Sequence, residues 1–178
     1  MKRSYGIAMV VLACVTACER GGAASSGAPA SAASPVEGVW RIAEVTVTGA
    51  NPSTTVDPPS VIIFAKTHYS MMRVNGGAER ALFKAVVPES EEKIAAYDSF
   101  IANTGTYELN GMTLTVRPTV AKHPNYMSGG YDTYEIRTSG DTLWLAGRDV
   151  NIRFRMGDSL VSDSNPVNET TLKLVRVE

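Results

Sequence analysis

A short hairpin pattern in the middle of the sequence constrains the fold more than any other stretch. Apolar and polar residues alternate over the five residues before Asn110-Gly111 and the five after it, which is the period of a half-buried strand. Asn-Gly is the strongest sequence signal for a type I′ turn. Such a turn would pair Tyr107 with Leu114 and place the apolar side chains on one face. The stretch therefore predicts an antiparallel sheet with one buried face.

Similar β-rich segments predict eight to nine short strands. The first, 39–47, loses its alternation near Ala43, which indicates a bulge or a strong bend. A second hairpin with its turn at Ser139-Gly140 would pair Ile136 with Leu143. The other predicted strands cover 60–65, 68–74, 131–138, 142–146, 149–156, 159–161 and 170–177.

A sheet of this size has two common arrangements, because many twisted strands either close into a barrel or split into a sandwich. Pairing of 38–47 with 170–177 would close the sheet and remove its exposed edges. An eight-stranded barrel is just wide enough for one small ligand.

The stretch 79–103 breaks the β pattern and predicts one inserted helix. Acidic residues follow Pro88, and these suit the positive end of a helix. Ile94, Tyr97 and Ile101 recur at helical spacing, with Ala96 and Phe100 beside them. We therefore expect an amphipathic helix that packs over the sheet or over an open barrel end.

The N-terminal 17 residues predict a signal peptide. Lys2 and Arg3 precede an apolar run, 7–15, that is too short to span a bilayer, and small residues follow it. The segment resembles the signal of bacterial lipoproteins, whose lipobox ends in a cysteine after small residues. Cys18 stands at that position.

The lipoprotein resemblance implies a membrane partner. It implies cleavage before Cys18, a diacylglycerol on its sulfur and a fatty acyl chain such as palmitate on its amino group. Two or three acyl chains anchor a protein stably. Glu19, where an Asp would favour the inner membrane, implies the outer membrane of the cell envelope. An ordinary signal peptide with a chance cysteine and a retained membrane anchor are the alternatives.

The rest of the chain is predicted to form a flexible tether followed by one folded domain. Residues 18–35 are rich in Gly, Ala and Ser and predict a flexible tether, and 36–178 are enough for one core. Because Cys14 leaves with the signal and Cys18 is acylated, we expect no disulfide. Without the two N-terminal basic residues, 15 basic residues face 18 acidic ones, which argues against nucleic acid as a partner.

A set of short motifs, in order, carries a second resemblance. Gly38-Val39-Trp40-Arg41 resembles the Gly-x-Trp start of lipocalins, and 104–114, 123–125 and 134–143 are similar to the bacterial lipocalin-like domain. The resemblance covers most of 36–178. It implies an all-β, antiparallel lipocalin-like barrel of eight to nine strands with one inserted α-helix.

The lipocalin resemblance also implies one contact at the closed end of the barrel. There the Trp packs against an Arg from the last strand, and the matching residues are Trp40 and Arg176. An ordinary core Trp with a solvated terminal Arg is the alternative. The later Thr-Asp-Tyr motif of lipocalins is absent from this sequence.

The sequence predicts no catalytic site, metal or cofactor. His68 and His123 are the only histidines, and two of them with scattered carboxylates make a poor zinc set. No Gly-x-Ser-x-Gly elbow occurs, and the glycine pairs lack the Lys-Ser/Thr of a phosphate loop. The pair His68 and Tyr69 would need a polar cavity containing both to act in an enzyme.

Inward-facing apolar and aromatic residues predict a pocket for a small hydrophobic or amphipathic ligand. The same residues could instead form a filled core, in which case the protein would be an envelope interaction or assembly protein with an external binding surface. The sequence leaves the oligomeric state open. The predicted ligand-binding residues are Phe64, Tyr69, Met71, Tyr107, Leu109, Leu114, Tyr134, Ile136, Leu143 and Leu145.

Overall fold

The computed structural model describes residues 34–76, 79–162 and 167–178. The predicted signal peptide, Cys18 and nearly all of the predicted tether lie outside these residues. Among the residues described, no helix is long and apolar enough to cross a membrane.

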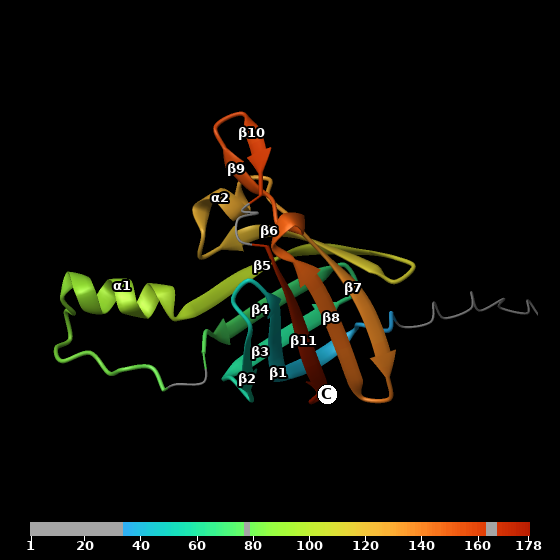
Figure 1. The fold of residues 1–178 in the computed structure, drawn as a ribbon, viewed down its shortest axis with the longest axis horizontal. Coiled ribbons are helices and arrows are strands. Elements are labelled where there is room, and N and C mark those ends of the chain that lie inside the picture. The colour runs from blue at the N-terminus through green and yellow to red at the C-terminus, as the bar shows by residue number, and fades with distance from the viewer. Residues whose placement is uncertain (1–33, 77–78, 163–166) are drawn as a thin grey trace, which may run out of the picture. The chain divides into compact units, whose positions relative to one another are not determined.

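Eight antiparallel strands form a closed barrel (Figure 1). Each strand pairs with its neighbours in turn, and the last strand pairs with the first to close the sheet. This confirms the predicted fold class and the predicted closure. The barrel strands are β1 (Gly38–Gly49), β3 (Ser60–Ala65), β4 (His68–Val74), β5 (Phe100–Asn110), β6 (Thr113–Ala121), β7 (Asp132–Ser139), β8 (Thr142–Arg148) and β11 (Asn168–Arg176).

The remaining elements lie outside the barrel wall. A short strand, β2 (Ser53–Val56), adds to β1. The helices α1 (Ser90–Asp98) and α2 (Pro124–Met127) leave the sheet between barrel strands. The predicted strand 149–156 is wrong in its first half, where the chain forms a 3-10 turn, η1 (Asp149–Asn151). A separate hairpin follows, made of β9 (Phe154–Met156) and β10 (Ser159–Val161).

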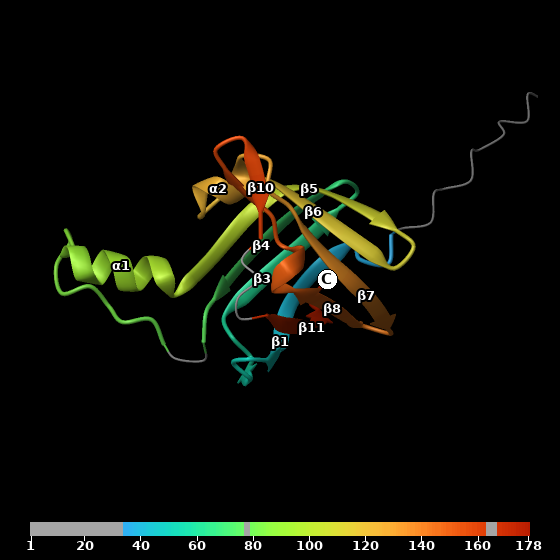
Figure 2. The ribbon, with the colours of Figure 1, turned by 45° about the horizontal axis from the view of Figure 1, so that its top comes forward.

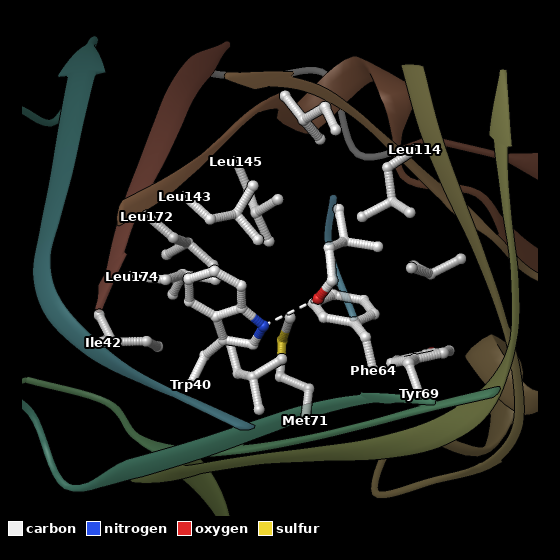
Figure 3. Close-up of a cluster of buried hydrophobic side chains, with 14 of the residues drawn as sticks. Trp40, Ile42, Phe64, Tyr69, Met71, Leu114, Leu143, Leu145, Leu172 and Leu174 are labelled. Carbon is white, nitrogen blue, oxygen red and sulfur yellow. Dashed lines mark hydrogen bonds between the residues drawn. The ribbon is translucent and has the colours of Figure 1, made fainter. Parts of the chain in front are cut away.

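The barrel interior is packed with apolar side chains (Figure 3). All eight barrel strands and every residue of this core lie within 34–178, so this part of the chain contains what it needs to fold on its own. The predicted irregularity in the first strand is confirmed, because the pairing of β1 with β11 shifts between Ile42 and Glu44. Such a bulge bends the strand around the barrel.

Both predicted hairpin turns are displaced by one residue. The observed loops are 111–112 and 140–141, each with a glycine at its first position. Gly111 has φ +61° and Gly140 has φ +53°, whereas the second residue of each loop has no positive φ. A positive φ at the first loop position alone is the pattern of a type II′ turn, not of the type I′ turn that the sequence predicted.

The displaced turns shift both registers by two residues. Tyr107 pairs with Val116 rather than with Leu114, and Ile136 pairs with Leu145 rather than with Leu143. Because side chains alternate with a period of two, a shift of two leaves every residue on its predicted face. The prediction of the buried face is confirmed, although the predicted partners are wrong.

The inserted helix α1 is present but does not pack as predicted. It begins at a capping box formed by Glu89 and Glu92, and none of its residues is buried. Phe100 and Ile101, which completed the predicted apolar stripe, belong instead to β5. The apolar side chains left on the helix cannot form a wide buried face, and Ile94 is 59% exposed.

Candidate functional site

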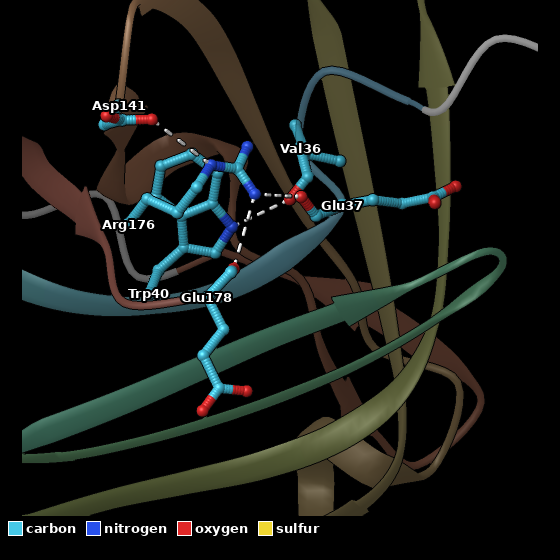
Figure 4. A network of polar contacts seen from close by, with 6 residues as sticks. All are labelled: Val36, Glu37, Trp40, Asp141, Arg176 and Glu178. Atoms are coloured by element: carbon cyan, nitrogen blue, oxygen red, sulfur yellow. Dashed lines mark hydrogen bonds and ion pairs between the residues drawn. The ribbon is translucent and has the colours of Figure 1, made fainter.

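One end of the barrel is closed by Trp40, which is only 1% exposed (Figure 4). Its indole Nε1 donates to the carbonyl oxygen of Val36 at 2.8 Å. The Arg176 guanidinium lies over the indole, 4.2 Å from the ring centroid, and donates to the carbonyl oxygen of Glu37 at 2.7 Å. The contact that the lipocalin resemblance implied is therefore present.

The same end requires a glycine at position 38. A Cβ on Gly38 would lie 2.1 Å from Nη1 of Arg176, and the residue has φ +134°, which side chains rarely tolerate. The glycine before the Trp thus lets the guanidinium lie against the backbone. The hydrogen-bonded indole of Trp40 and guanidinium of Arg176 thus close this end of the barrel.

A cavity of about 350 Å³ lies at the opposite end. This is the lower part of the usual range for small-molecule sites, roughly 300–1,000 Å³. The strand ends around it belong to β4, β5, β6, β7, β8 and β11, and α2 and β9 lie together at this end (Figure 2). The apolar part of the lining includes Met71, Ile101, Ala121, Ile152, Phe154 and Leu172.

The structure brings the ten predicted ligand-binding residues together in one interior cluster, and two of them, Met71 and Tyr134, line the cavity. Leu109 and Tyr134 are partly buried at the edge of the cluster. The residues that pack in the barrel interior away from the cavity are Phe64, Tyr69, Tyr107, Leu109, Leu114, Ile136, Leu143 and Leu145.

The most deeply buried charged side chain in the cavity is Asp132, the first residue of β7, which is 4% exposed. Burial raises its pKa to about 6, and the nearby charge of Asp149 adds to the rise. Hydrogen bonds from the Tyr134 side chain and from the Thr133 backbone, the latter 2.7 Å long, oppose it. In the described part of the chain, no Lys, Arg or His lies within ion-pair distance of this carboxylate.

Aromatic side chains surround Asp132. Tyr126 on α2 and Phe154 on β9 contact each other, with ring centroids 5.6 Å apart, and Tyr134 lies two residues along β7. Burial and the charge of Asp132 both raise the pKa of Tyr126 and of Tyr134, so both phenols stay neutral. Tyr69 is shifted in the same way, and its buried hydroxyl has no hydrogen-bond partner among the described residues.

Small local features hold these rings in place. A Cβ on Gly147 would lie 2.9 Å from the Tyr134 ring, so only glycine lets that ring lie against β8. On the other side, the Asn125 amide donates to the carbonyl oxygen of Arg155 at 2.6 Å and ties α2 to β9. The Tyr126 and Phe154 rings are thereby fixed over the cavity.

Of the other charged side chains that line the cavity, Asp149 and Lys122 have hydrogen-bond partners. Asp149 accepts hydrogen bonds from the backbone and the side chain of Asn168, at 3.1 and 3.0 Å. Lys122 donates to the carbonyl oxygen of Tyr97 at 2.6 Å and lies over the same ring. Arg73 also lines the cavity, and burial lowers its pKa.

Asp132 and Arg73 are not among the predicted site residues, although the sequence carries a signal for both. Asp132 has the same strand parity as Tyr134 and Ile136, and Arg73 has the parity of Tyr69 and Met71. A charged residue at an inward position of a strand is unusual, and this position marked both residues as candidates.

The candidate enzyme pair does not share a cavity. β4 places buried Tyr69 on the inner face and exposed His68 on the outer face, where the imidazole Nδ1 lies 3.0 Å from the Thr67 hydroxyl. Across the described residues, no group of three or more His, Cys, Asp or Glu side chains is arranged to hold a metal ion.

Comparison with known proteins adds no family assignment. No protein-family model matches the chain, and no curated protein matches its sequence significantly. The barrel and its cavity are therefore the basis for a functional proposal.

Proposed function

We propose that this protein binds a small amphipathic molecule in a lipocalin-like barrel at the bacterial cell envelope. The observation that supports this most directly is the contrast along the barrel axis. One end is closed by Trp40 and Arg176, and the other holds a cavity of about 350 Å³ whose lining surface is mostly apolar but includes several charged and polar side chains. That combination is the usual composition of a small-molecule site.

Two features support the lipocalin-like part of the proposal. The eight strands follow one another around the barrel in sequence order, and the last pairs with the first. Trp40 from the Gly-x-Trp start of β1 packs against Arg176 from the last strand. The barrel alone would not assign the protein to a family, since one fold serves many functions.

The envelope location rests on the sequence. The basic, apolar and small-residue segments that end at Cys18 support a lipid anchor on that residue, and Glu19 supports the outer membrane. Mass spectrometry of the protein from its own membranes tests this: we expect a chain that begins at an acylated Cys18. An N-terminus elsewhere, or an unmodified Cys18, would contradict the anchor.

Ligand binding can be tested with N-phenyl-1-naphthylamine, a neutral probe that fluoresces in apolar sites. We expect saturable binding to residues 34–178. Ile101→Trp should weaken it at least about tenfold, because Ile101 lines the cavity and the larger ring fills it. Ile94→Trp on α1 is the matched control, since Ile94 is 59% exposed and does not line the cavity. Equal effects of the two variants, or no binding at all, would refute the proposal.

An external interaction surface is a second candidate, favoured by the segment 79–98, which we name the arm. Val86 is 100% exposed, Leu82 is 93% exposed and no residue of α1 is buried. The arm holds itself together, since Arg80 donates to the carbonyl oxygen of Ala96 at 3.0 Å. Apolar side chains exposed to this degree are typical of interaction sites.

A further inference from the structure

We propose that the ligand of this cavity is an amphipathic organic cation whose ammonium group binds beside Asp132, between the Tyr126, Tyr134 and Phe154 side chains. This inference rests on the proposed ligand-binding function and names the chemical class of the ligand. Three observations support it: an unpaired buried carboxylate, the aromatic side chains around it and the placement of the basic residues.

The first observation is that Asp132 lacks a counter-charge. It is 4% exposed, and its hydrogen bonds come from a backbone amide and a phenol, with no basic side chain of the described residues at ion-pair distance. A buried carboxylate is stable only when it is paired, coordinated or protonated. A cation in the cavity would supply the missing charge.

The second observation is the aromatic lining. Tyr126 and Phe154 lie with ring centroids 5.6 Å apart, and Tyr134 lines the same cavity. Aromatic faces attract organic cations, and the attraction grows where water is excluded. Met71, Ile101 and Leu172 line the rest of the cavity and would contact the apolar part of the ligand.

The third observation is that none of the described basic side chains lining the cavity pairs with Asp132. Lys122 is held by the Tyr97 carbonyl oxygen and ring, and Arg148 is exposed. Arg73 lines the same cavity but lies outside ion-pair distance of the Asp132 carboxylate. An anionic ligand group beside Asp132 would be repelled by the like charge of its carboxylate.

Cation binding should depend on pH, because it requires the ionised carboxylate. The titratable or charged groups that face Asp132 are Asp149 on η1, Tyr126 on α2, Tyr134 on β7 and Tyr69 and Arg73 on β4, while Lys122, His123 and Arg148 also line the cavity. Free Asp132 has a pKa of about 6, so below that pH the cation must displace a proton. The affinity should fall up to about tenfold per pH unit there.

The test is calorimetric titration of residues 34–178 with three probes of equal chain length: octyltrimethylammonium, octanoate and 1-octanol. We expect the cation to bind at least about tenfold more tightly than the other two. Asp132→Asn should abolish this preference, because it removes the charge that attracts the ammonium group. Glu135→Gln, on the outward face of the same strand, is the matched control and should leave the preference intact.

The outcomes separate this inference from the proposed function. If 1-octanol or octanoate binds as tightly as the cation, the ligand class is wrong although the cavity still binds small molecules. If none of the three binds, both proposals fail. Should Asp132→Asn not fold, the pH series on the unmodified protein decides, and a cation preference that is equal at pH 5 and pH 7.5 overturns the inference. His123→Gln should retain the pH dependence, and its loss would assign the titration to His123 and overturn the role of Asp132.

Discussion

The two ends of this barrel are built from the same eight strands but treat their polar groups differently. At the closed end, the Trp40 indole and the Arg176 guanidinium both donate to backbone carbonyl oxygens, and they stack on each other. At the open end, Asp132 is more than nine-tenths buried and has no ion-pair partner in the described structure.

This difference separates structural polar groups from functional ones. Polar groups that are buried for stability are paired within the protein, because an unpaired buried group costs free energy. A charge that stays buried and unpaired beside a cavity costs stability, and such groups concentrate where a ligand or substrate binds. The closed end therefore maintains the barrel, and the open end is where we expect its chemistry.

The largest expected effect is at the closed end. Trp40→Ala should lower the free energy of unfolding of residues 34–178 by about 3–5 kcal/mol, because it removes a fully buried indole. Trp144→Ala is the matched control: Arg137 stacks on that ring too, 3.6 Å from its centroid, but Trp144 is only partly buried.

Urea denaturation measures both variants, and we expect about 1 kcal/mol for the control. Similar losses for the two tryptophans would show that the closed end is not a special site of stability. Probe binding in the cavity should change little in folded Trp40→Ala, since the indole does not line the cavity.

At the open end, we expect a substitution to raise the free energy of unfolding rather than lower it. Asp132→Asn should raise the free energy of unfolding at pH 7.5 by about 2–3 kcal/mol, because a buried unpaired charge is removed while the Thr133 amide keeps an acceptor. A decrease in stability at pH 7.5 would show that the ionised carboxylate stabilises the fold.

The expected gain in stability should depend on pH, because Asp132 titrates at different pH values in the folded and unfolded states. The pKa of Asp132 is about 6 in the folded state, above the ordinary 3.8, so ionisation is less favourable in the folded protein. The contribution of this group to stability is fully present below about pH 3.8 and is lost as the pH rises towards 6. The gain from Asn should therefore be near zero at pH 3.5 and level off above pH 6, whereas Glu135→Gln should change stability by less than about 0.5 kcal/mol at both.

The sequence predicted which side chains lie on the buried face of the sheet better than it predicted which residues pair across neighbouring strands. Strand parity survives a displaced turn, so the buried faces of the two hairpins were right although the loops at Gly111 and Gly140 moved each register by two residues. Turn type depends on backbone angles that a dipeptide signal specifies only weakly, and a glycine at either loop position is compatible with a tight turn.

The cavity could be predicted only in part, for a related reason. Parity placed Met71 and Tyr134 in the barrel interior, and both line the cavity. Strand parity does not distinguish the interior side chains that fill the barrel from those that line the cavity. That distinction depends on α2 and β9, whose packing at the open end is not a periodic property of the sequence. Helical spacing likewise misassigned Phe100 and Ile101, where a strand paired with β4 outweighed local propensity.

The smallest expected effect concerns the arm, which connects β4 to β5 at the open end. Replacing Leu82, Val86 and Val87 with Ser should change the free energy of unfolding by less than about 0.5 kcal/mol, since these side chains are 93%, 100% and 76% exposed. Probe affinity in the cavity should also be unchanged. A loss of more than about 1 kcal/mol, or a changed affinity, would show that the arm packs over the cavity in solution. If the free energy of unfolding and the probe affinity are unchanged but the full-length protein sediments differently, the arm instead makes contacts between molecules, separate from both ends of the barrel.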